Sequence, residues 1–172
     1  KRQFLRFPVV STGAEYLVMG YLMRRNILTY KAPPGNEGYD LICIHPDPRH
    51  VRRGSKKAQV RIQVKSRYQS DCDKGFPVKA ASLDAFDYLV VAFLNIGNFF
   101  RGSDGKSGLR EIEFFTLPSA FVRKHHRPDS GWQKVSLRGR DDEISRYRNE
   151  DGFELIASEL GIERPVRRSS AK

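Results

Sequence analysis

The sequence is poor in cysteine and has no long apolar run. Its two cysteines are Cys43, in an apolar stretch, and Cys72, in a polar one. They form neither a disulfide framework nor a CxxC-type metal set, so we expect two reduced thiols. No apolar run approaches the roughly 20 residues of a membrane-spanning helix, and residues 1–10 lack the apolar core of a signal peptide. We therefore expect a soluble, cytoplasmic protein. Because the sequence does not begin with Met, we also expect it to be a trimmed form.

Acidic residues are scarce relative to basic ones. The chain has 31 Lys and Arg against 20 Asp and Glu, which gives a formal net charge of +11 and a pI of about 9.9. This excess favours a polyanionic partner such as DNA, because each neutralised phosphate releases condensed counterions. The alternative is a basic but otherwise ordinary surface. With 172 residues, the chain has the length of one globular domain with a sizeable core.

The sequence lacks the residue patterns of several common catalytic, metal-binding and RNA-binding sites. The serines have no nearby histidine with an orienting acid, so nothing supports acyl transfer. His125 and His126 are most simply explained as cations at a helix end, because no second pair of Cys or His stands at zinc-ligand spacing. An RNA-binding or ribosome-associated protein is the weakest alternative, since there is no aromatic RNP-type strand and no GXXG clamp.

The stretch from residue 38 to residue 67 organises the chain. Asp40 precedes the apolar run 41–44, which predicts a strand buried on both faces. Residues 58–67 alternate apolar and polar side chains, which predicts a strand with one buried face. If these strands pair, Asp40 lies beside Gln63 and Lys65, which stand on one face roughly 6 to 7 Å apart. Taken singly, Asp40 could cap a turn and Lys65 could be an edge residue with a solvated ammonium group.

Turn signals and hydrophobic periodicity predict the other elements. Thr12 and Glu15 have the spacing of a capping box at the start of the first helix, and Asn26 suits its left-handed end. Gly161 would end the last helix. In chain order we expect a helix at 13–25, a short strand at 27–31, a brief helix at 82–85, strands at 87–94 and 111–117, a helix at 118–124, an edge strand within 131–139 and a capped helix at 151–160. Residues 1–10 form an N-terminal arm, and the sequence is compatible both with an added edge strand and with no strand there.

Asp40 with Gln63-Val64-Lys65 resembles the PD-(D/E)XK nuclease superfamily. The segment RIQVKS resembles the corresponding segment in a branch of predicted endonucleases, including some homing endonucleases, in which QxK is usual. Gln63 stands where most members have Glu or Asp. The resemblance covers about residues 11–94. It implies an α/β protein with a restriction-endonuclease-like αβββαβ core, a central mixed sheet flanked by helices. We expect the core to span 1–125 and an extension packed on it to span 126–172, ending in a basic, disordered tail.

The resemblance also implies a function and roles for individual residues. It implies a Mg²⁺- or Mn²⁺-dependent DNA endonuclease in which Asp40 is the principal metal ligand. The Gln63 side-chain oxygen and the Val64 carbonyl would complete the protein's ligands, and Lys65 would point at the attacking water or a phosphate oxygen. Because Gln63 removes one negative charge, Glu15 in the first helix would compensate. A capping-box role explains Glu15 equally well, and the two roles are compatible.

Two further predictions concern the partners. Basic residues of the strand and of the loop before it are expected to contact DNA: Arg52, Arg53, Lys56, Lys57, Arg61 and Arg67. With one active site per chain, cutting both strands would favour a homodimer or a higher homo-oligomer. The alternative to an enzyme is a catalytically inactive nuclease-fold domain that binds nucleic acid or a protein partner, because Gln63 replaces the second acid.

Overall fold

A computed structural model describes residues 8–68, 74–96, 110–128 and 132–164. Cys72, residues 1–7 of the N-terminal arm and the C-terminal tail from residue 165 lie outside the described residues. The predictions for Cys72 and for the disordered tail therefore stay predictions.

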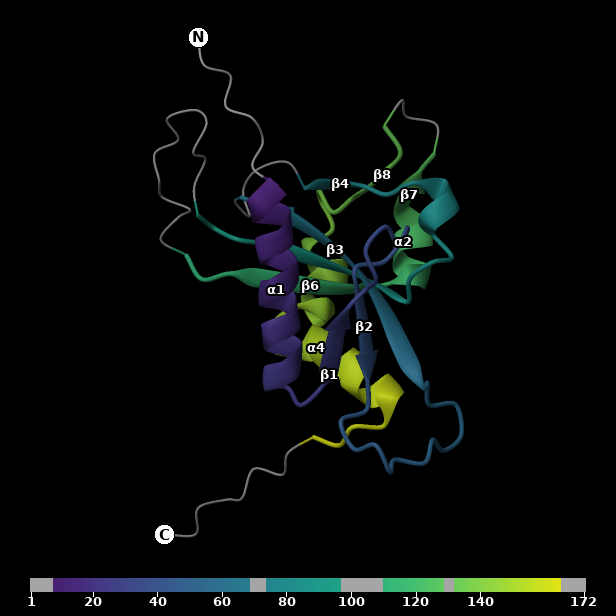
Figure 1. The fold of residues 1–172 in the computed structure, drawn as a ribbon. Helices are drawn as coiled ribbons and strands as arrows, with labels where there is room; N and C mark the ends of the chain where they lie inside the picture. Colours follow the sequence, from purple (N-terminus) through teal and green to yellow (C-terminus); the bar gives the residue numbers. More distant parts are fainter. Residues whose placement is uncertain (1–7, 69–73, 97–109, 129–131, 165–172) are drawn as a thin grey trace.

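A five-stranded mixed sheet forms the centre of the structure. Its strands are β1 (Leu28–Lys31), β2 (Leu41–Ile44), β3 (Gln59–Arg67), β5 (Tyr88–Phe93) and β6 (Glu113–Pro118). They lie in the order β1-β2-β3-β5-β6 (Figure 1). Only the β3–β5 pair is parallel among these neighbours. The predicted strands at 27–31, 58–67, 87–94 and 111–117 are thus confirmed, with ends that differ by one or two residues.

Each face of the sheet has its own hydrophobic core. Helices α1 (Pro8–Arg24) and α4 (Asn149–Leu160) pack on the face that presents Ile62 of β3 and Val90 of β5. Helix α2 (Ser119–His125) and a second, small sheet pack on the face that presents Leu89 and Val91 (Figure 1). Strand β5 is buried over its whole length, as predicted, because it lies between the two cores. The predicted division of the chain at residue 125 stays a prediction, although α4 shares the core of α1.

The small sheet contains β4 (Gly75–Pro77), β8 (Lys134–Ser136) and β7 (His126–Arg127), in the order β4-β8-β7. The edge strand predicted within 131–139 is therefore wrong in its position, because β8 has a partner on each side. Strands as short as β4 and β7 leave no periodic signal that would have predicted them. Three short helices complete the described chain: the 3-10 helices η1 (Ala80–Ser82) and η3 (Ser145–Tyr147), and α3 (Asp141–Ile144).

The predicted helix starts need correction. Helix α1 begins at Pro8, because proline suits the first helical position, so Thr12 lies inside the helix and the capping-box prediction is wrong. Helix α4 begins at Asn149 and has no side-chain cap. The brief helix expected at 82–85 is η1, one turn of 3-10 helix that begins at residue 80. The predicted left-handed ends are confirmed at Asn26 (φ 64°) and Gly161 (φ 76°).

Burial in β2 also differs from the prediction. Leu41 and Cys43 are buried, whereas Ile42 and Ile44 are only partly buried. The strand therefore has one core face, and Leu41 and Cys43 belong to the core of α1 and α4. Burial raises the pKa of the Cys43 thiol to about 12, against a weaker opposing effect of its hydrogen bond with Thr29. This thiol is consequently protonated at neutral pH.

Two glycines in helices provide a matched test of this packing. A Cβ at Gly152 of α4 would overlap the backbone oxygen of Tyr147 and lie 2.8 Å from Thr116 Oγ1, whereas a Cβ at Gly20 of α1 meets nothing within 4 Å. We expect Gly152→Ala to destabilise the fold by about 2 to 3 kcal/mol, because backbone atoms cannot rotate away. Gly20→Ala should instead stabilise it by about 0.5 to 1 kcal/mol. Urea unfolding followed by circular dichroism measures both, and an unchanged midpoint for Gly152→Ala would contradict this packing.

Candidate active site

The site begins where β2 stops pairing with β3. The first paired residue of β2, Leu41, lies opposite Ile62, so residues 63–67 of β3 extend past the end of β2. Asp40 contacts β3 at the point where β2 ends. Its N–H donates to the Ile62 carbonyl at 2.8 Å, and its Oδ2 accepts the Val64 N–H at 2.6 Å. The predicted pairing of the two strands is confirmed, and the Asp40 side chain continues the hydrogen-bonding ladder for one more step.

A cavity of about 430 Å³ opens at this unpaired edge of β3. It brings together a carboxylate from α1, the carboxylate before β2 and the last residues of β3. Its lining residues are Val10, Ser11, Glu15, Asp40, Val64, Lys65, Ser66, Arg67, Tyr68 and Pro77. Four residues of the predicted site, Glu15, Asp40, Val64 and Lys65, therefore share one cavity.

Glu15 reaches the cavity from the middle of α1. Its side chain is 19% exposed and forms an ion pair with Lys31 of β1. Since Thr12 is not a helix cap, a capping box no longer explains an acid at this position. The partner Lys31 was not among the residues predicted from sequence, because a charged residue in a short strand gives no signal of what it faces. Lys31 neutralises one of the two carboxylates that line the cavity.

Lys65 directly follows Val64, the residue whose N–H donates to the Asp40 carboxylate. Burial lowers the pKa of its ammonium group below the ordinary lysine value, and the charge of Arg67 acts in the same direction. The Asp40 carboxylate opposes both effects but does not cancel them. The structure thus places a partly desolvated lysine beside a carboxylate. Desolvation strengthens the interaction of such a cation with an anionic substrate.

Gln63 lies beside Asp40, because Asp40 contacts the residues on either side of it, Ile62 and Val64. Its side chain is 8% exposed, and its Oε1 has no hydrogen-bond partner among the described residues. It lines a second cavity of about 630 Å³, together with Trp132 and Lys79. Lys65 lines both cavities. The two cavities therefore adjoin at the QxK motif, whose Gln63 and Lys65 lie on one face of β3.

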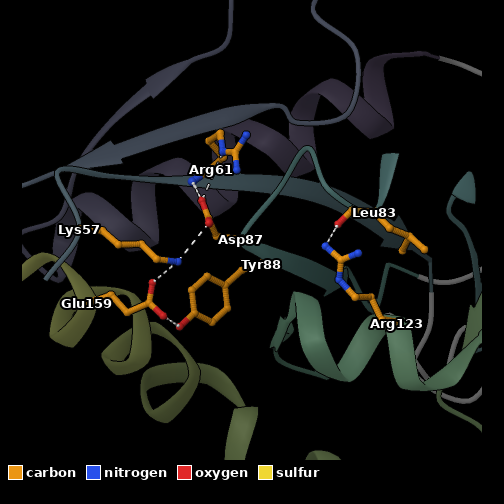
Figure 2. Close-up of polar contacts among 7 residues, drawn as sticks. All are labelled: Lys57, Arg61, Leu83, Asp87, Tyr88, Arg123 and Glu159. Carbon is orange, nitrogen blue, oxygen red and sulfur yellow. Dashed lines mark hydrogen bonds and ion pairs between the residues drawn. The ribbon is translucent and has the colours of Figure 1, made fainter. Parts of the chain in front are cut away.

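The basic loop before β3 lies at the other end of this strand. Gln59 and Lys65 are six residues apart in β3, a separation of about 20 Å in an extended strand. Lys56 Nζ donates to the Ser158 carbonyl at 2.7 Å near the end of α4. Lys57 Nζ lies 3.0 Å from an Asp87 oxygen and 2.9 Å from a Glu159 oxygen (Figure 2). These two lysines hold the loop on α4, which is a role that the sequence did not predict.

The other predicted DNA contacts differ in their surroundings. Arg52 and Arg53 are exposed in the same loop. The Arg61 backbone N–H donates to Asp87 Oδ2 at 2.7 Å, and its side chain contacts the same oxygen (Figure 2). Arg67 donates to the Gly75 carbonyl, lies 4.9 Å over the Phe76 ring and lines the first cavity. Only Arg67 among these four combines a place at the cavity with a fixed guanidinium group.

No family model matches the sequence, and no curated protein matches it. A solved structure, the bacterial homing endonuclease I-Ssp6803I, superposes with a TM-score of 0.54 at 14% identity, covering 92% of this chain and 98% of that chain. The chain has a PD-(D/E)XK-like nuclease fold. A second match, Hjc, a Holliday junction resolvase from the archaeal hyperthermophile Archaeoglobus fulgidus, has a TM-score of 0.43 at 12% identity and covers 91% of this chain and 99% of that chain. The predicted restriction-endonuclease-like fold class is confirmed.

Within this PD-(D/E)XK-like fold, the first cavity has the donors that a hard divalent cation prefers. The residues that the structure describes contain no group of three His, Cys, Asp or Glu at metal-binding distance. Mg²⁺, however, is commonly held by one or two carboxylates together with waters and substrate oxygens. Asp40 and Glu15 provide two carboxylates in this cavity. The Val64 carbonyl points to the same side of β3 as the Val64 N–H that Asp40 accepts, because both groups of one strand residue share an edge. This donor set fits Mg²⁺ or Mn²⁺.

No helix in the described part of the chain is both long and apolar enough to cross a membrane.

Proposed function

We propose that this chain is a cytoplasmic, metal-dependent DNA endonuclease that hydrolyses phosphodiester bonds. The observation that carries the proposal is the shared cavity of Asp40, Glu15 and Lys65 at the unpaired edge of β3. The PD-(D/E)XK-like fold and the formal net charge of +11 support it. A basic protein of this kind would bind the phosphate backbone mainly through electrostatic attraction.

In this proposal Asp40, Glu15 and the Val64 carbonyl hold Mg²⁺ or Mn²⁺. Such an ion supplies an activated water and neutralises charge on the scissile phosphate. Lys65 places its ammonium group where negative charge develops on a phosphate oxygen. Glu15 must exchange its ion pair with Lys31 for the metal. Gln63 is the fourth ligand of this proposal, because its buried side-chain oxygen has no hydrogen-bond partner among the described residues.

A second function has a specific observation in its favour. The cavity holds two carboxylates, and Lys31 already neutralises one of them. Gln63 stands where most PD-(D/E)XK nucleases have an acid. A chain of this fold that binds nucleic acid or a protein partner without cutting would have these features. Its binding would be indifferent to divalent metal, whereas the endonuclease requires metal to cut.

The arrangement of one site per chain bears on oligomeric state. A single cavity of this kind cuts one strand at a time, so a double-strand break requires two copies. We propose that the active form on duplex DNA is a homodimer or a higher homo-oligomer. Sedimentation of the chain with and without DNA tests this, and a monomer that breaks both strands in one binding event would contradict it.

Metal-dependent nicking tests the proposed function directly. The substrates are supercoiled plasmid, a branched DNA and a library of random sequence, each with Mg²⁺, with Mn²⁺ and with chelator. We expect nicking with either metal, none with chelator, and none by Asp40→Asn, which loses the charge of the principal ligand. Asp47→Asn is the matched control, because Asp47 pairs with Arg49 on an exposed loop and should leave nicking unchanged.

The outcomes separate the two functions. Metal-dependent nicking that is lost in Asp40→Asn and kept in Asp47→Asn establishes the endonuclease. DNA binding without nicking of any substrate, at equal affinity with metal and with chelator, favours the non-catalytic function. Equal nicking by Asp40→Asn and the unmodified chain would reject this cavity as the active site.

A further inference from the structure

The ion pair between Glu15 and Lys31 holds a ligand of the proposed metal site in the chain without metal. Glu15 lines the first cavity, whereas Lys31 is not among its lining residues. The cation therefore acts on the cavity through the Glu15 carboxylate. Lys31 holds neither the metal nor the phosphate in the proposed mechanism, so its place beside a metal ligand calls for a separate explanation.

The backbones on both sides of this ion pair are held in place. Glu15 belongs to the middle of α1, whose inner face is buried in the core that α1 shares with α4. Lys31 is in register with Leu41 of β2, and the next residue, Ala32, donates its N–H to the Asp40 carbonyl at 2.8 Å. The two groups consequently cannot separate by a shift of the helix or the strand. An exchange of partners requires only that the flexible four-carbon side chain of the lysine changes its conformation.

Lys31 has a second partner outside the cavity. Its Nζ lies 5.4 Å from the centroid of the Tyr16 ring, which is within the distance of a cation–π interaction. Tyr16 follows Glu15 in α1 and is 54% exposed, and it does not line the cavity. An ammonium group that leaves Glu15 can therefore keep its contact with this ring and gain contact with water. Release of the lysine does not create a buried, unpaired cation.

A divalent cation and Lys31 compete for the same negative charge. The cavity holds two carboxylates, those of Asp40 and Glu15, and Lys31 offsets one of them. The affinity of oxygen-ligand sites for divalent cations depends strongly on the number of charged ligands. Screening by solvent is weaker for a partly buried ion pair than for an exposed one. Lys31 therefore lowers the metal affinity of the site, while it prevents repulsion between the two carboxylates when no metal is bound.

We infer that Lys31 is an exchangeable counter-ion of the metal site. It holds Glu15 in the metal-free chain, competes with the divalent cation for that carboxylate, and moves toward the exposed Tyr16 ring when the metal binds. The inference deepens the proposed function by naming how metal loading is regulated, and it rests on the proposed function for the metal at Asp40 and Glu15. Loading then depends on the concentration of divalent cation, because each ion must displace an ammonium group of the chain itself.

Equilibrium binding of Mn²⁺ to the chain without DNA tests the inference independently of cleavage. We expect Lys31→Met to bind Mn²⁺ about tenfold more tightly, because one competing positive charge is lost. Lys31→Arg should stay within about twofold of the unmodified chain, because a guanidinium group still pairs with Glu15. A merely structural role of Lys31 predicts the opposite sign, since looser packing of α1 on β1 would weaken the site.

A double-mutant cycle shows whether Lys31 acts through Glu15. Glu15→Gln should weaken Mn²⁺ binding, and Lys31→Met should have little further effect in that background, since the contested charge is absent. Lys74→Met is the matched control and should leave the affinity unchanged. Lys74 forms an ion pair with Asp141 at 2.8 Å, neither residue lines the cavity, and its loss changes the net charge by the same amount. Circular dichroism checks the fold of each variant.

An affinity that is unchanged or weaker in Lys31→Met would overturn the inference, as would an equal gain in Lys74→Met or in the Glu15→Gln background. Its failure is distinguishable from failure of the proposed function. Metal-dependent nicking by a chain whose Mn²⁺ affinity does not depend on Lys31 would reject the inference and keep the endonuclease. Tighter Mn²⁺ binding by Lys31→Met, without nicking of any DNA by the unmodified chain, would keep the counter-ion and reject the endonuclease.

Discussion

Lys65→Met is expected to slow DNA cleavage by about 10² to 10³-fold, which is the usual effect of removing one donor that stabilises transition-state charge. Methionine keeps much of the side-chain volume and removes the ammonium group. Affinity for DNA in chelator should fall by less than about tenfold, because one phosphate contact among several is lost. Single-turnover cleavage and equilibrium binding measure the two effects separately.

The pH dependence shows how Lys65 acts. Burial, the largest effect, lowers its pKa below the ordinary lysine value of about 10.4. If the protonated ammonium group is the active form, cleavage falls as pH rises through this lowered pKa, and it falls at a lower pH than a free lysine would show. Lys65→Arg should retain some activity and lose this alkaline fall, since a guanidinium group stays protonated. If Lys65 instead removed a proton from water, cleavage would rise with pH over the same range.

Lys124→Met is the control for loss of positive charge. Lys124 is on α2, and its side chain is 72% exposed. The two variants have the same net charge, so a general electrostatic effect on DNA binding would lower cleavage equally in both. A normal rate in Lys124→Met with a hundredfold loss in Lys65→Met locates the effect at the cavity. Equal, small losses in both would show that Lys65 contributes only to the overall field of the protein.

The local pattern of the sequence was sufficient to predict β3 and its partner. Alternation along 58–67 has a period of two, and an Asp directly before an apolar run can only lie near that strand if the two pair. The structure confirms the pairing and adds the hydrogen bond from the Val64 N–H to Asp40. Contacts between residues adjacent in a sheet are thus available from the period and the motif. The extent of the unpaired edge of β3 was not, because it depends on where β2 ends.

Tertiary contacts account for what the sequence did not show. The Glu15–Lys31 ion pair joins a helix and a strand whose relative placement no local pattern encodes. The aromatic at the second cavity, Trp132, arrives there because β8 pairs with β4, a strand of three residues. The roles of Lys56 and Lys57 were likewise hidden, since a basic loop that binds phosphate and one that binds the end of a helix have the same composition. In each case the deciding partner comes from a distant part of the chain.

The second large effect is expected for stability: Asp87→Ala should destabilise the fold by about 2 to 3 kcal/mol. Asp87 precedes β5, and its carboxylate accepts the Arg61 N–H at 2.7 Å and contacts Lys57 Nζ at 3.0 Å (Figure 2). Its side chain is 17% exposed, and alanine leaves the partly buried Arg61 N–H without an acceptor. The value lies below that for a fully buried ion pair because Lys57 is 41% exposed and partly solvated. Urea unfolding at pH 7 measures the loss.

The same network predicts how stability depends on pH. Burial alone would raise the pKa of Asp87, but the Arg61 N–H and the Lys57 ammonium outweigh it and hold the pKa below its ordinary value. A carboxyl group whose pKa is lowered by folding adds stability above its unfolded pKa of about 3.9 and loses it as pH falls through the folded value. The difference in stability between the unmodified chain and Asp87→Asn should therefore be constant near neutral pH and shrink below about pH 4.

Asp84→Asn separates this network from ordinary surface charge. Asp84 pairs with Arg123 at 2.6 Å, but its side chain is 87% exposed. Its loss should cost no more than about 1 kcal/mol, as for other solvated pairs. Lys57 contacts both Asp87, directly before β5, and Glu159 of α4, so Asp87→Ala also removes an indirect link between β5 and α4. If Asp87→Ala is no more destabilising than Asp84→Asn, the contacts of Asp87 add no more to the free energy of unfolding than a solvated ion pair does.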